Sequence, residues 1–403
     1  MPPGGSWQLV NSTLPPYDLG HLADTVHHSV RVEQCARDTP GWRFGWVERG
    51  EGPELKDASQ FCSLMRGTNI LLLGDSLSMQ MYESWRARLR QERYANGNEA
   101  GQRHCHEVCE GPAPVLCSGL CAGSGTNDND RYSSHYSVCD NGAAAMIAQI
   151  FRWTLSAHSF HSGDSRVARC AQRLRINPRE FDIVPVPRKH VDMLLEYAAR
   201  SIPSPRPNQQ HGVHRLAVVY NQLAHIHPII SKLTQCYERH GGLEAALAES
   251  AATRDVLRFW AQDQAKWAVA LQEARRALMT ARPDLTVDIF YRTAPASSCD
   301  YFCKPPFPRE PLELAQVVRA VLQVDSQPMH YSHQYAYWVN DMARAAFAAQ
   351  GFGIIDLEPM LSVRADAHPA SFNGTGDTFH YCQPGPGDWG LDAVLRHVAR
   401  SRT

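Results

Sequence analysis

Short apolar runs alternate along the chain with longer stretches in which apolar residues recur at helical spacing. The apolar runs are unbroken and bounded by turn residues, which is typical of strands buried on both faces of a sheet. They cover residues 69–74, 145–153, 215–221, 286–293 and 352–358. The helical stretches cover residues 76–95, 243–280 and 334–351, and the last is expected to end with Gly351 at its C′ position. Strands that alternate with helices predict an α/β fold with a mostly parallel sheet covered on both faces.

The regions outside this alternation predict the domain organisation. Residues 1–34 are punctuated by proline and glycine and predict an irregular lead-in, while residues 35–403 predict one domain. Within that domain, residues 96–142 are rich in Gly, Asn, Ser and Cys, which predicts a long insertion, and residues 201–212 predict a loop. A chain of 403 residues is long enough for one large α/β domain or for two domains.

The composition is that of an ordinary globular protein, with 43% hydrophobic and 20% charged residues. The formal charge of −1 argues against a nucleic-acid or anionic-membrane partner, because both require a basic surface. No apolar run reaches the length of about 18 residues that marks a membrane-spanning helix, so no membrane span is expected.

Twelve cysteines indicate an oxidising compartment. Their number is even and five of them lie between residues 105 and 139, which fits disulfides in a lumenal or secreted protein. The glycosylation sequons at Asn11 and Asn373 agree with that location. The first residues contain no apolar segment of a signal peptide, so we expect either a truncated gene model or a different compartment.

The first predicted strand ends at Gly74-Asp75-Ser76, directly before a helical pattern. A serine at such a turn is a candidate nucleophile, because its hydroxyl is exposed above the sheet edge and the free N–H groups of the helix can stabilise an oxyanion. Gly74 would allow the tight turn. The alternative is that Asp75 or Ser76 simply caps the helix, since both residue types are preferred caps.

Asp377 and His380 are candidates for the two partners that a nucleophilic serine needs. His380 would act as the general base for Ser76. Asp377, three residues earlier, could orient the imidazole and stabilise its protonated form.

Polar side chains also end two later strands. Asn221 ends the run 215–221 and could donate its amide to an oxyanion, and His225 would lie on the same rim. Arg292 falls at the end of the next strand. Because parallel sheets bind ligands at the carboxyl ends of their strands, we expect these residues beside Ser76. The alternative is a loop asparagine and a surface histidine.

The order of these motifs resembles that of the SGNH/GDSL hydrolase clan. More specifically, it looks like the PC-esterase branch, which includes the plant trichome birefringence-like proteins and the Cas1p-type glycan O-acetyltransferases. The matching stretches are NILLLGDSLSMQMYESW, VVYNQLAH, DIFYRTAPASSC and the C-terminal block that begins at IIDLEPML. In that block Arg364, Asp366 and His368 precede Asp377 and His380. The resemblance covers about residues 35–400.

This resemblance implies a three-layer α/β/α, flavodoxin-like SGNH fold and an O-acetyltransferase in the Golgi lumen or secreted from the cell. Ser76 would attack an acetyl donor, either acetyl-CoA or an acylated carrier, while His380 takes the proton and Asp377 orients His380. A hydroxyl of a glycan or polysaccharide, such as a cell-wall polymer, would then take the acetyl group from the acyl-serine. No bound cofactor is implied.

The same resemblance implies roles for two arginines. Arg292 and Arg364 could neutralise a donor phosphate or hold a glycan, and structural ion pairing is an equally good expectation for each. The chain departs from the plant pattern in the shell around the triad. Residues 79–81 are Met-Gln-Met where the plant proteins carry Arg-Asn-Gln, and Tyr381 stands where they carry Trp. These departures bear on the acceptor more than on the chemistry.

Zinc binding is the competing hypothesis for a site. Residues 104–121 hold two histidines and four cysteines. The cysteine spacing differs from the common CxxC zinc pairs, and an oxidising lumen favours disulfides, so no metal is expected.

Two other functions stay open at this point. An acyl esterase of the same clan would use the same triad, with water in place of the sugar hydroxyl. A lumenal glycan-binding protein with a vestigial triad would use none of it.

Overall fold

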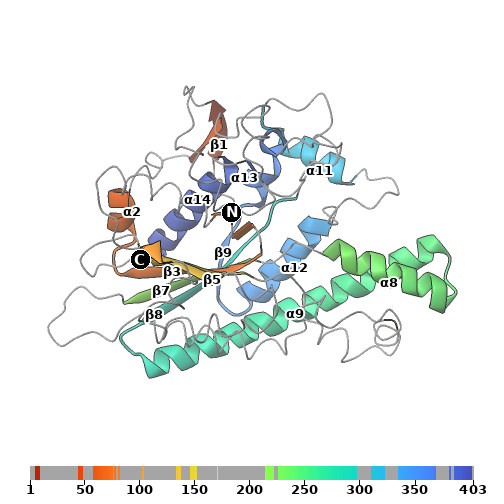
Figure 1. The fold of residues 1–403 in the computed structure, drawn as a ribbon, viewed down its shortest axis with the longest axis horizontal. Helices are drawn as coiled ribbons and strands as arrows, with labels where there is room; N and C mark the ends of the chain where they lie inside the picture. The colour runs from red at the N-terminus through yellow and green to blue at the C-terminus, as the bar shows by residue number, and fades with distance from the viewer. Residues whose placement is uncertain are drawn as a thin grey trace.

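We describe the fold from a computed structural model, in which the following residues are placed: 5–9, 44–48, 58–75, 77–78, 80–81, 102–103, 133–137, 146–151, 170, 214–221, 226–296, 310–322, 335–368, 381–382 and 385–401. All statements about the structure concern these residues. Figure 1 shows them as a central sheet between helices.

The central sheet has seven strands in the order β4-β5-β6-β3-β7-β8-β9. Four neighbouring strands are all parallel: β3 (Thr68–Gly74), β7 (Arg215–Asn221), β8 (Thr286–Arg292) and β9 (Gly353–Ile355). On the other side of β3, β6 (Met146–Phe151) pairs parallel to it. At that edge β5 (Ser133–Ser137) and β4 (Gln102–Arg103) continue the sheet with antiparallel pairing. The predicted α/β fold with a mostly parallel sheet is thus confirmed.

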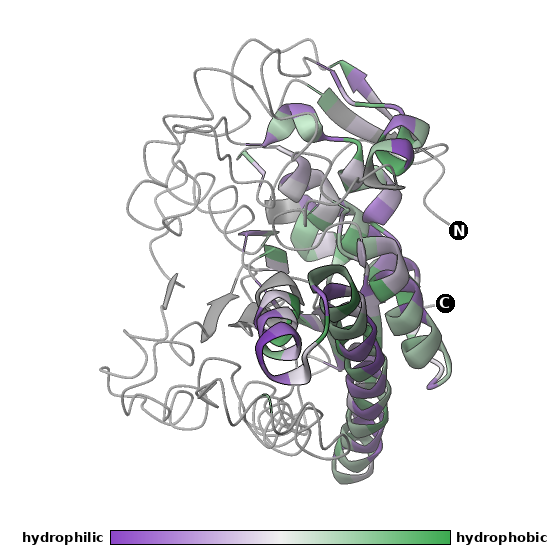
Figure 2. Cartoon of the chain, turned by 90° about the vertical axis from the view of Figure 1, so that its right-hand side faces the viewer, coloured by the Kyte–Doolittle hydropathy of each residue, from purple (hydrophilic) through white to green (hydrophobic). Residues whose placement is uncertain are grey.

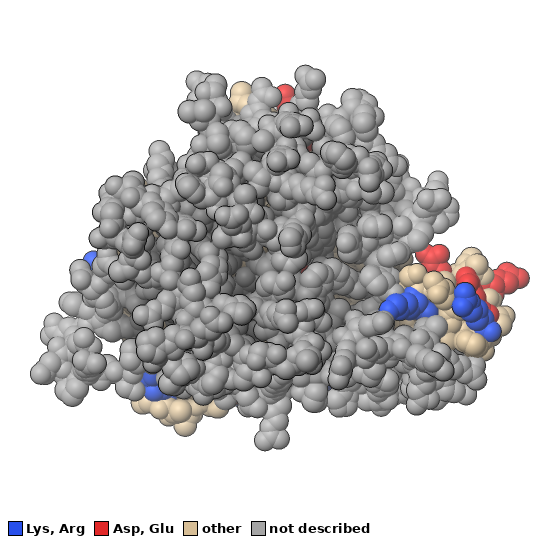
Figure 3. All heavy atoms as spheres, in the orientation of Figure 1, with Lys and Arg blue, Asp and Glu red and all other residues tan. Residues whose placement is uncertain are grey.

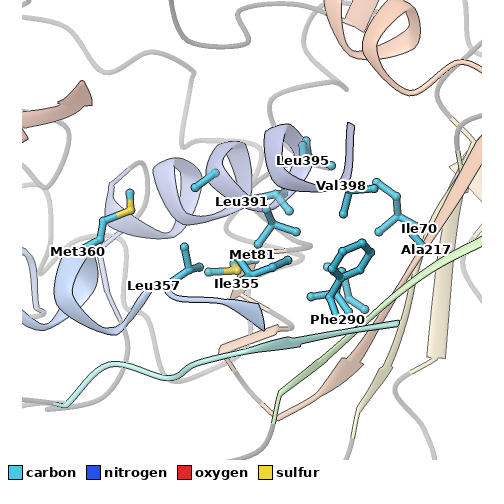
Figure 4. Close-up of a cluster of buried hydrophobic side chains, with 14 of the residues drawn as sticks. Ile70, Met81, Ala217, Phe290, Ile355, Leu357, Met360, Leu391, Leu395 and Val398 are labelled. Atoms are coloured by element: carbon cyan, nitrogen blue, oxygen red, sulfur yellow. The ribbon is translucent and has the colours of Figure 1, made fainter. Parts of the chain in front are cut away.

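Helices cover both faces of the sheet because every strand in its centre is apolar on both sides. One face carries Ile70, Leu72 and Val219, which pack with α14 (Pro386–Arg400), α13 (Glu358–Ser362) and α2 (Ala58–Leu64). Figure 4 shows this cluster between α14 and the strands. The other face carries Leu71, Leu73 and similar residues, which pack with α9 (Ala245–Ala281) and α12 (Ala336–Ala348).

A long helical hairpin extends the second face. It consists of α8 (Ile226–Gly241) and α9, which follow each other along the chain and pack together (Figure 1). In Figure 2, hydrophilic and hydrophobic residues alternate along α9, as expected for a helix with one buried side. Charges of both signs gather at the tip of this hairpin in Figure 3, where Arg239 and Glu244 are exposed.

A small antiparallel sheet and two short helical segments complete the described structure. The sheet pairs β1 (Gly5–Leu9) with β2 (Phe44–Glu48). The remaining helices are α11 (Leu314–Leu322) and the 3₁₀ helix η6 (Ala365–Ala367). The described residues include no helix that is both long enough and apolar enough to span a bilayer.

Disulfides are present, as the cysteine content predicts. Cys170 and Cys236 form one, with their Cα atoms 5.7 Å apart, and it fixes Cys170 to α8. Cys62 and Cys382 each belong to a disulfide as well. Such bonds persist in oxidising compartments, which favours a location of that kind.

The end of α12 agrees with the sequence pattern. Gly351 has a φ of 74°, and the N–H groups of Gly351 and Phe352 bond to the carbonyl oxygens of Ala348 and Phe347. These two bonds are the Schellman arrangement with glycine at C′, so the predicted role of Gly351 is confirmed.

Two other expectations differ from the structure. The fifth strand was expected over 352–358, but β9 covers Gly353–Ile355 and Glu358 already begins α13. The cause is Thr293, whose Oγ1 accepts hydrogen bonds from the N–H groups of Leu357 and Glu358 and so turns the chain away from the sheet. The region expected as an insertion contributes β4 and β5 to the sheet, and the expected lead-in contributes β1.

Candidate functional site

Three residues that end neighbouring parallel strands form a row at the carboxyl edge of the sheet. Gly74 pairs with Asn221, and Tyr220 pairs with Tyr291, which places Arg292 beside Asn221. We call Gly74, Asn221 and Arg292 the carboxyl-edge row. Residues two positions earlier on each strand pack toward α14, so the row faces that side of the sheet as well.

Gly74 is required by close packing. A Cβ at this position would lie 2.3 Å from the backbone oxygen of Asn221 and 2.6 Å from Oγ of Ser78. Both distances are far below those of real contacts, so any side chain at residue 74 would force β3 and β7 apart at their ends. Gly74 therefore fixes how closely the turn after β3 approaches the row.

Asp75 caps the segment after β3. Its buried Oδ1 accepts a hydrogen bond from the N–H of Leu77 at 3.1 Å, and its carbonyl oxygen accepts one from the N–H of Ser78 at 3.0 Å. The helical residues 77–78 and 80–81 follow directly. A cap supplied by Asp75 does not require the hydroxyl of Ser76 for that purpose.

Asn221 is buried, and its amide is held in place by one hydrogen bond. Its Nδ2 donates to the backbone oxygen of Arg292 at 2.8 Å, which ties the ends of β7 and β8 together. Its Oδ1 is buried and has no hydrogen-bond partner among the described residues. The second N–H of this amide is the donor that an oxyanion at the row would use.

Arg292 lies between the strand ends and the turn that follows β3. Its side chain is buried, and its Nη2 donates to Oγ of Ser78 at 3.1 Å. Its Nη1 is buried without a hydrogen-bond partner among the described residues. Burial lowers the pKa of the guanidinium, while the charge of Asp75 and the hydroxyls of Tyr291 and Tyr381 act in the opposite direction.

Gln80 clamps the turn after β3 to the segment 381–382, although 301 residues separate the two. Its Oε1 accepts a hydrogen bond from the N–H of Tyr381 at 3.2 Å, and its Nε2 donates to the oxygen of Tyr381. A side-chain amide that binds both the N–H and the C=O of one residue acts like a neighbouring strand. Tyr381 directly follows His380, and Gln80 stands four residues after Ser76.

Tyr381 and Cys382 are held from other directions too. The hydroxyl of Tyr381 donates to the oxygen of Leu361 at 2.9 Å, and its ring lies 4.5 Å from that of His368, centroid to centroid. The N–H of Cys382 donates to the oxygen of Ala367 at 2.7 Å. The residues that follow His380 therefore have one defined position relative to the row.

Arg364 has no free group for a substrate. Its guanidinium is fully buried and binds both carboxylate oxygens of Asp366, at 2.8 and 3.0 Å. It also lies over the ring of Trp7, 4.2 Å from the centroid, and donates to the oxygen of Phe44. These contacts fix the β1–β2 sheet to the C-terminal part of the chain, which favours the structural alternative for Arg364.

A polar network around a fully hydrogen-bonded amide supports the end of β8. Asn340 on α12 donates to the oxygen of Ala294 and to Oε2 of Glu358, and its Oδ1 accepts from the N–H of Ala294 and from the hydroxyl of Tyr291. Burial raises the pKa of Glu358 to about 7, against the opposing effects of Arg344 and Asn340. All four hydrogen bonds of this amide are formed, in contrast to Asn221.

The described structure thus brings together Gly74, Asp75, Asn221 and Arg292. It adds Ser78, Gln80 and Tyr381, of which the sequence analysis noted the last two only as departures from the plant pattern. Ser76, His225, Asp377 and His380 lie outside the described residues, as do the sequons at Asn11 and Asn373. Gln80 carries no signal in the sequence, because its partner is distant along the chain.

No cluster of three histidine, cysteine or acidic side chains that could hold a metal occurs in the described part of the chain. Residues 104–121, the competing zinc hypothesis, lie outside that part. No protein-family model matches the chain, and no curated protein matches it significantly.

Proposed function

We propose that this protein is an acyl-transfer enzyme that moves an acetyl group onto a glycan hydroxyl, with Ser76, His380 and Asp377 as its catalytic triad. The observation that carries the proposal is the clamp between Gln80 and the backbone of Tyr381. It joins Gln80, four positions after Ser76, to Tyr381, the residue directly after His380. A nucleophile and its base must meet in this way across a long separation in sequence.

In the first half-reaction, Oγ of Ser76 attacks the acetyl carbon and the bond to the donor breaks. His380 takes the serine proton and passes it to the leaving group. In the second, His380 takes the proton of a sugar hydroxyl, whose oxygen attacks the acyl-serine; the ester bond to Ser76 breaks and the proton returns to its Oγ. In both steps, Asn221 offers a buried N–H donor to the oxyanion.

The finer assignments of fold and location belong to the same proposal. A parallel sheet covered by helices on both faces supports a three-layer, flavodoxin-like SGNH fold of the PC-esterase type. The disulfide between Cys170 and Cys236 supports a Golgi-lumen or secreted location. The acceptor would be a glycan or polysaccharide, and the donor acetyl-CoA or an acylated carrier.

The test is an acetyl-transfer assay with the purified full chain, acetyl-CoA labelled in its acetyl group, and a panel of oligosaccharides. Label on sugar that is lost in Ser76→Ala supports the proposal. Free acetate alone, lost in the same variant, shows the acyl esterase instead. Neither product, with oligosaccharides still bound, shows the non-catalytic glycan-binding protein.

The matched control is Ser401→Ala. Ser401 lies at the opposite edge of the sheet, where its Oγ accepts a hydrogen bond from Arg215. Its replacement removes a hydroxyl of the same kind far from the row, so this variant is expected to keep the activity of the wild type.

A further inference from the structure

Arg292 differs from the buried Arg215 and Arg364 because its charge forms no ion pair with a described carboxylate. Arg215 is 3% exposed and pairs with Asp288 at 2.5 Å, and Arg364 is fully buried and pairs with Asp366. Arg292 is 1% exposed and forms no ion pair with any described carboxylate. A buried cation without a paired anion costs several kcal/mol, so its presence calls for a physical reason.

The contacts of Arg292 place it where the two proposed catalytic segments meet. Its Nη2 reaches Ser78, on the turn that carries Ser76, and Asp75 on the same turn acts on its charge. Tyr381, which follows His380, also acts on it. The remaining Nη1 is buried and unpartnered in the described structure.

We infer that Arg292 is a positioning residue of the proposed acyl-transfer reaction, and that it keeps a buried positive charge, without an ion pair to any described carboxylate, beside the proposed nucleophilic turn for the anionic transition state. This inference rests on the proposed function. Charge that is already in place costs no reorganisation when the oxyanion forms. The hydrogen bond to Ser78 also fixes the turn, so that the serine and the imidazole keep one geometry.

The charge has a second consequence, for the base. A positive charge near an imidazole disfavours its protonated form and lowers its pKa. Loss of the charge should therefore raise the pKa of the base and move the acid limb of the pH–rate profile to higher pH. The other groups that act on Arg292 are Asp75, Tyr291 and Tyr381. Both tyrosines stay neutral, because burial raises their pKa.

A fluorophosphonate probe tests this without knowledge of the donor or acceptor. Oγ of Ser76 forms a bond to phosphorus, the phosphorus–fluorine bond breaks, fluoride leaves and the serine proton passes to the base. Labelling rates of the full chain are measured from pH 5 to pH 9 for wild type, Arg292→Gln and Arg292→Lys. Arg215→Gln is the matched control, a buried arginine at the opposite edge whose charge is paired.

Arg292→Gln is expected to label about 100-fold more slowly with its acid limb shifted upward, whereas Arg292→Lys keeps the wild-type profile and most of the rate. Arg215→Gln should label at the wild-type rate. Equal losses in both Arg292 variants with an unshifted profile would show a structural role and overturn the inference. So would an unchanged rate in Arg292→Gln.

Two further results separate the inference from the proposed function. If the wild type is not labelled, or if Ser76→Ala is labelled equally well, both fail. If circular dichroism shows that Arg292→Gln is unfolded, Ser78→Ala removes the hydrogen bond and keeps the arginine. That variant is expected to label about tenfold more slowly, because the turn is no longer fixed. Its pH–rate profile should keep the position of the wild type, because the charge of the arginine is still present. A wild-type rate in it contradicts the inference.

Discussion

Buried polar side chains at the two edges of the central sheet differ in how many of their hydrogen bonds and ion pairs are formed. At the amino edge, Arg215 pairs with Asp288 and donates to the oxygen of Val398 and to Oγ of Ser401. At the carboxyl edge, Arg292 has one side-chain hydrogen bond to a described residue, and its Nη1 has no partner in that part of the chain. Asn221 there leaves its Oδ1 unpartnered in the described structure.

This difference suggests that the amino edge contributes to stability and that the carboxyl edge is the place for the proposed function. Paired groups at the amino edge stabilise the attachment of α14 to β7 and leave nothing for a ligand. Polar atoms at the carboxyl edge that have no partner among the described residues lower stability, and under the proposed function they would be retained because a substrate can use them. The strands β7 and β8 run from one edge to the other, so the two edges differ in their side chains and not in the strands that form them.

The largest effect is expected from loss of the proposed base. His380→Ala should lower the acetyl-transfer rate about 10⁴-fold, because a triad without its base keeps only oxyanion stabilisation and binding. His397→Ala is the control, because this histidine packs against Phe290 on the side of α14 near the amino edge. An equal loss of rate in both variants would remove the functional distinction between the edges.

Loss of the paired arginine should give the largest effect on stability. Arg215→Gln is expected to lower the free energy of unfolding by about 3 kcal/mol, because Asp288 and two further acceptors lose their partner. Arg292→Met should be nearly neutral or stabilising, since it removes a buried charge that forms no ion pair with a described carboxylate. Urea unfolding measures both, and a larger loss in Arg292→Met would reverse the comparison.

The two glycines that flank β3 give a smaller and sharper test. Gly74→Ala should cost about 2 kcal/mol and lower activity strongly, because its Cβ would meet the rigid backbone of Asn221. Gly67→Ala should cost about 1 kcal/mol, for a φ of 68°, with activity unchanged. Its Cβ meets the exposed side chain of His214, which can move. Loss of activity in Gly67→Ala would contradict the assignment of the edges.

The last test concerns the pH dependence of stability. Burial raises the pKa of Glu358 from 4.5 in the unfolded chain to about 7 in the folded one. The folded state then binds the extra proton, so stability from this group is present below pH 4.5 and is lost as the pH rises to 7. Glu358→Gln should remove most of this decline, because the glutamine amide does not ionise over this range of pH. Thermal unfolding from pH 4 to pH 8 checks it, with the exposed Glu244→Gln as a control that leaves the slope unchanged.

Several elements were predictable because their signals are local. The strands β3 and β7 are unbroken apolar runs, and α9 and α12 follow helical spacing up to recognisable ends. The ends of β7 and β8 also predicted that Asn221 and Arg292 would share one edge. The turn into α13 was not predictable, because it depends on the hydroxyl of Thr293 from another strand.

The amino-acid sequence by itself determined the alternation of strands and helices and the polar residues that end the strands. Both follow from local periodicity, since a strand buried on two faces must be apolar throughout. The tertiary structure alone decided which buried arginine is paired, why residue 74 must be glycine, and how Gln80 joins two segments 301 residues apart. Those properties depend on distances between atoms that the chain brings together only when it folds, so no local pattern can carry them.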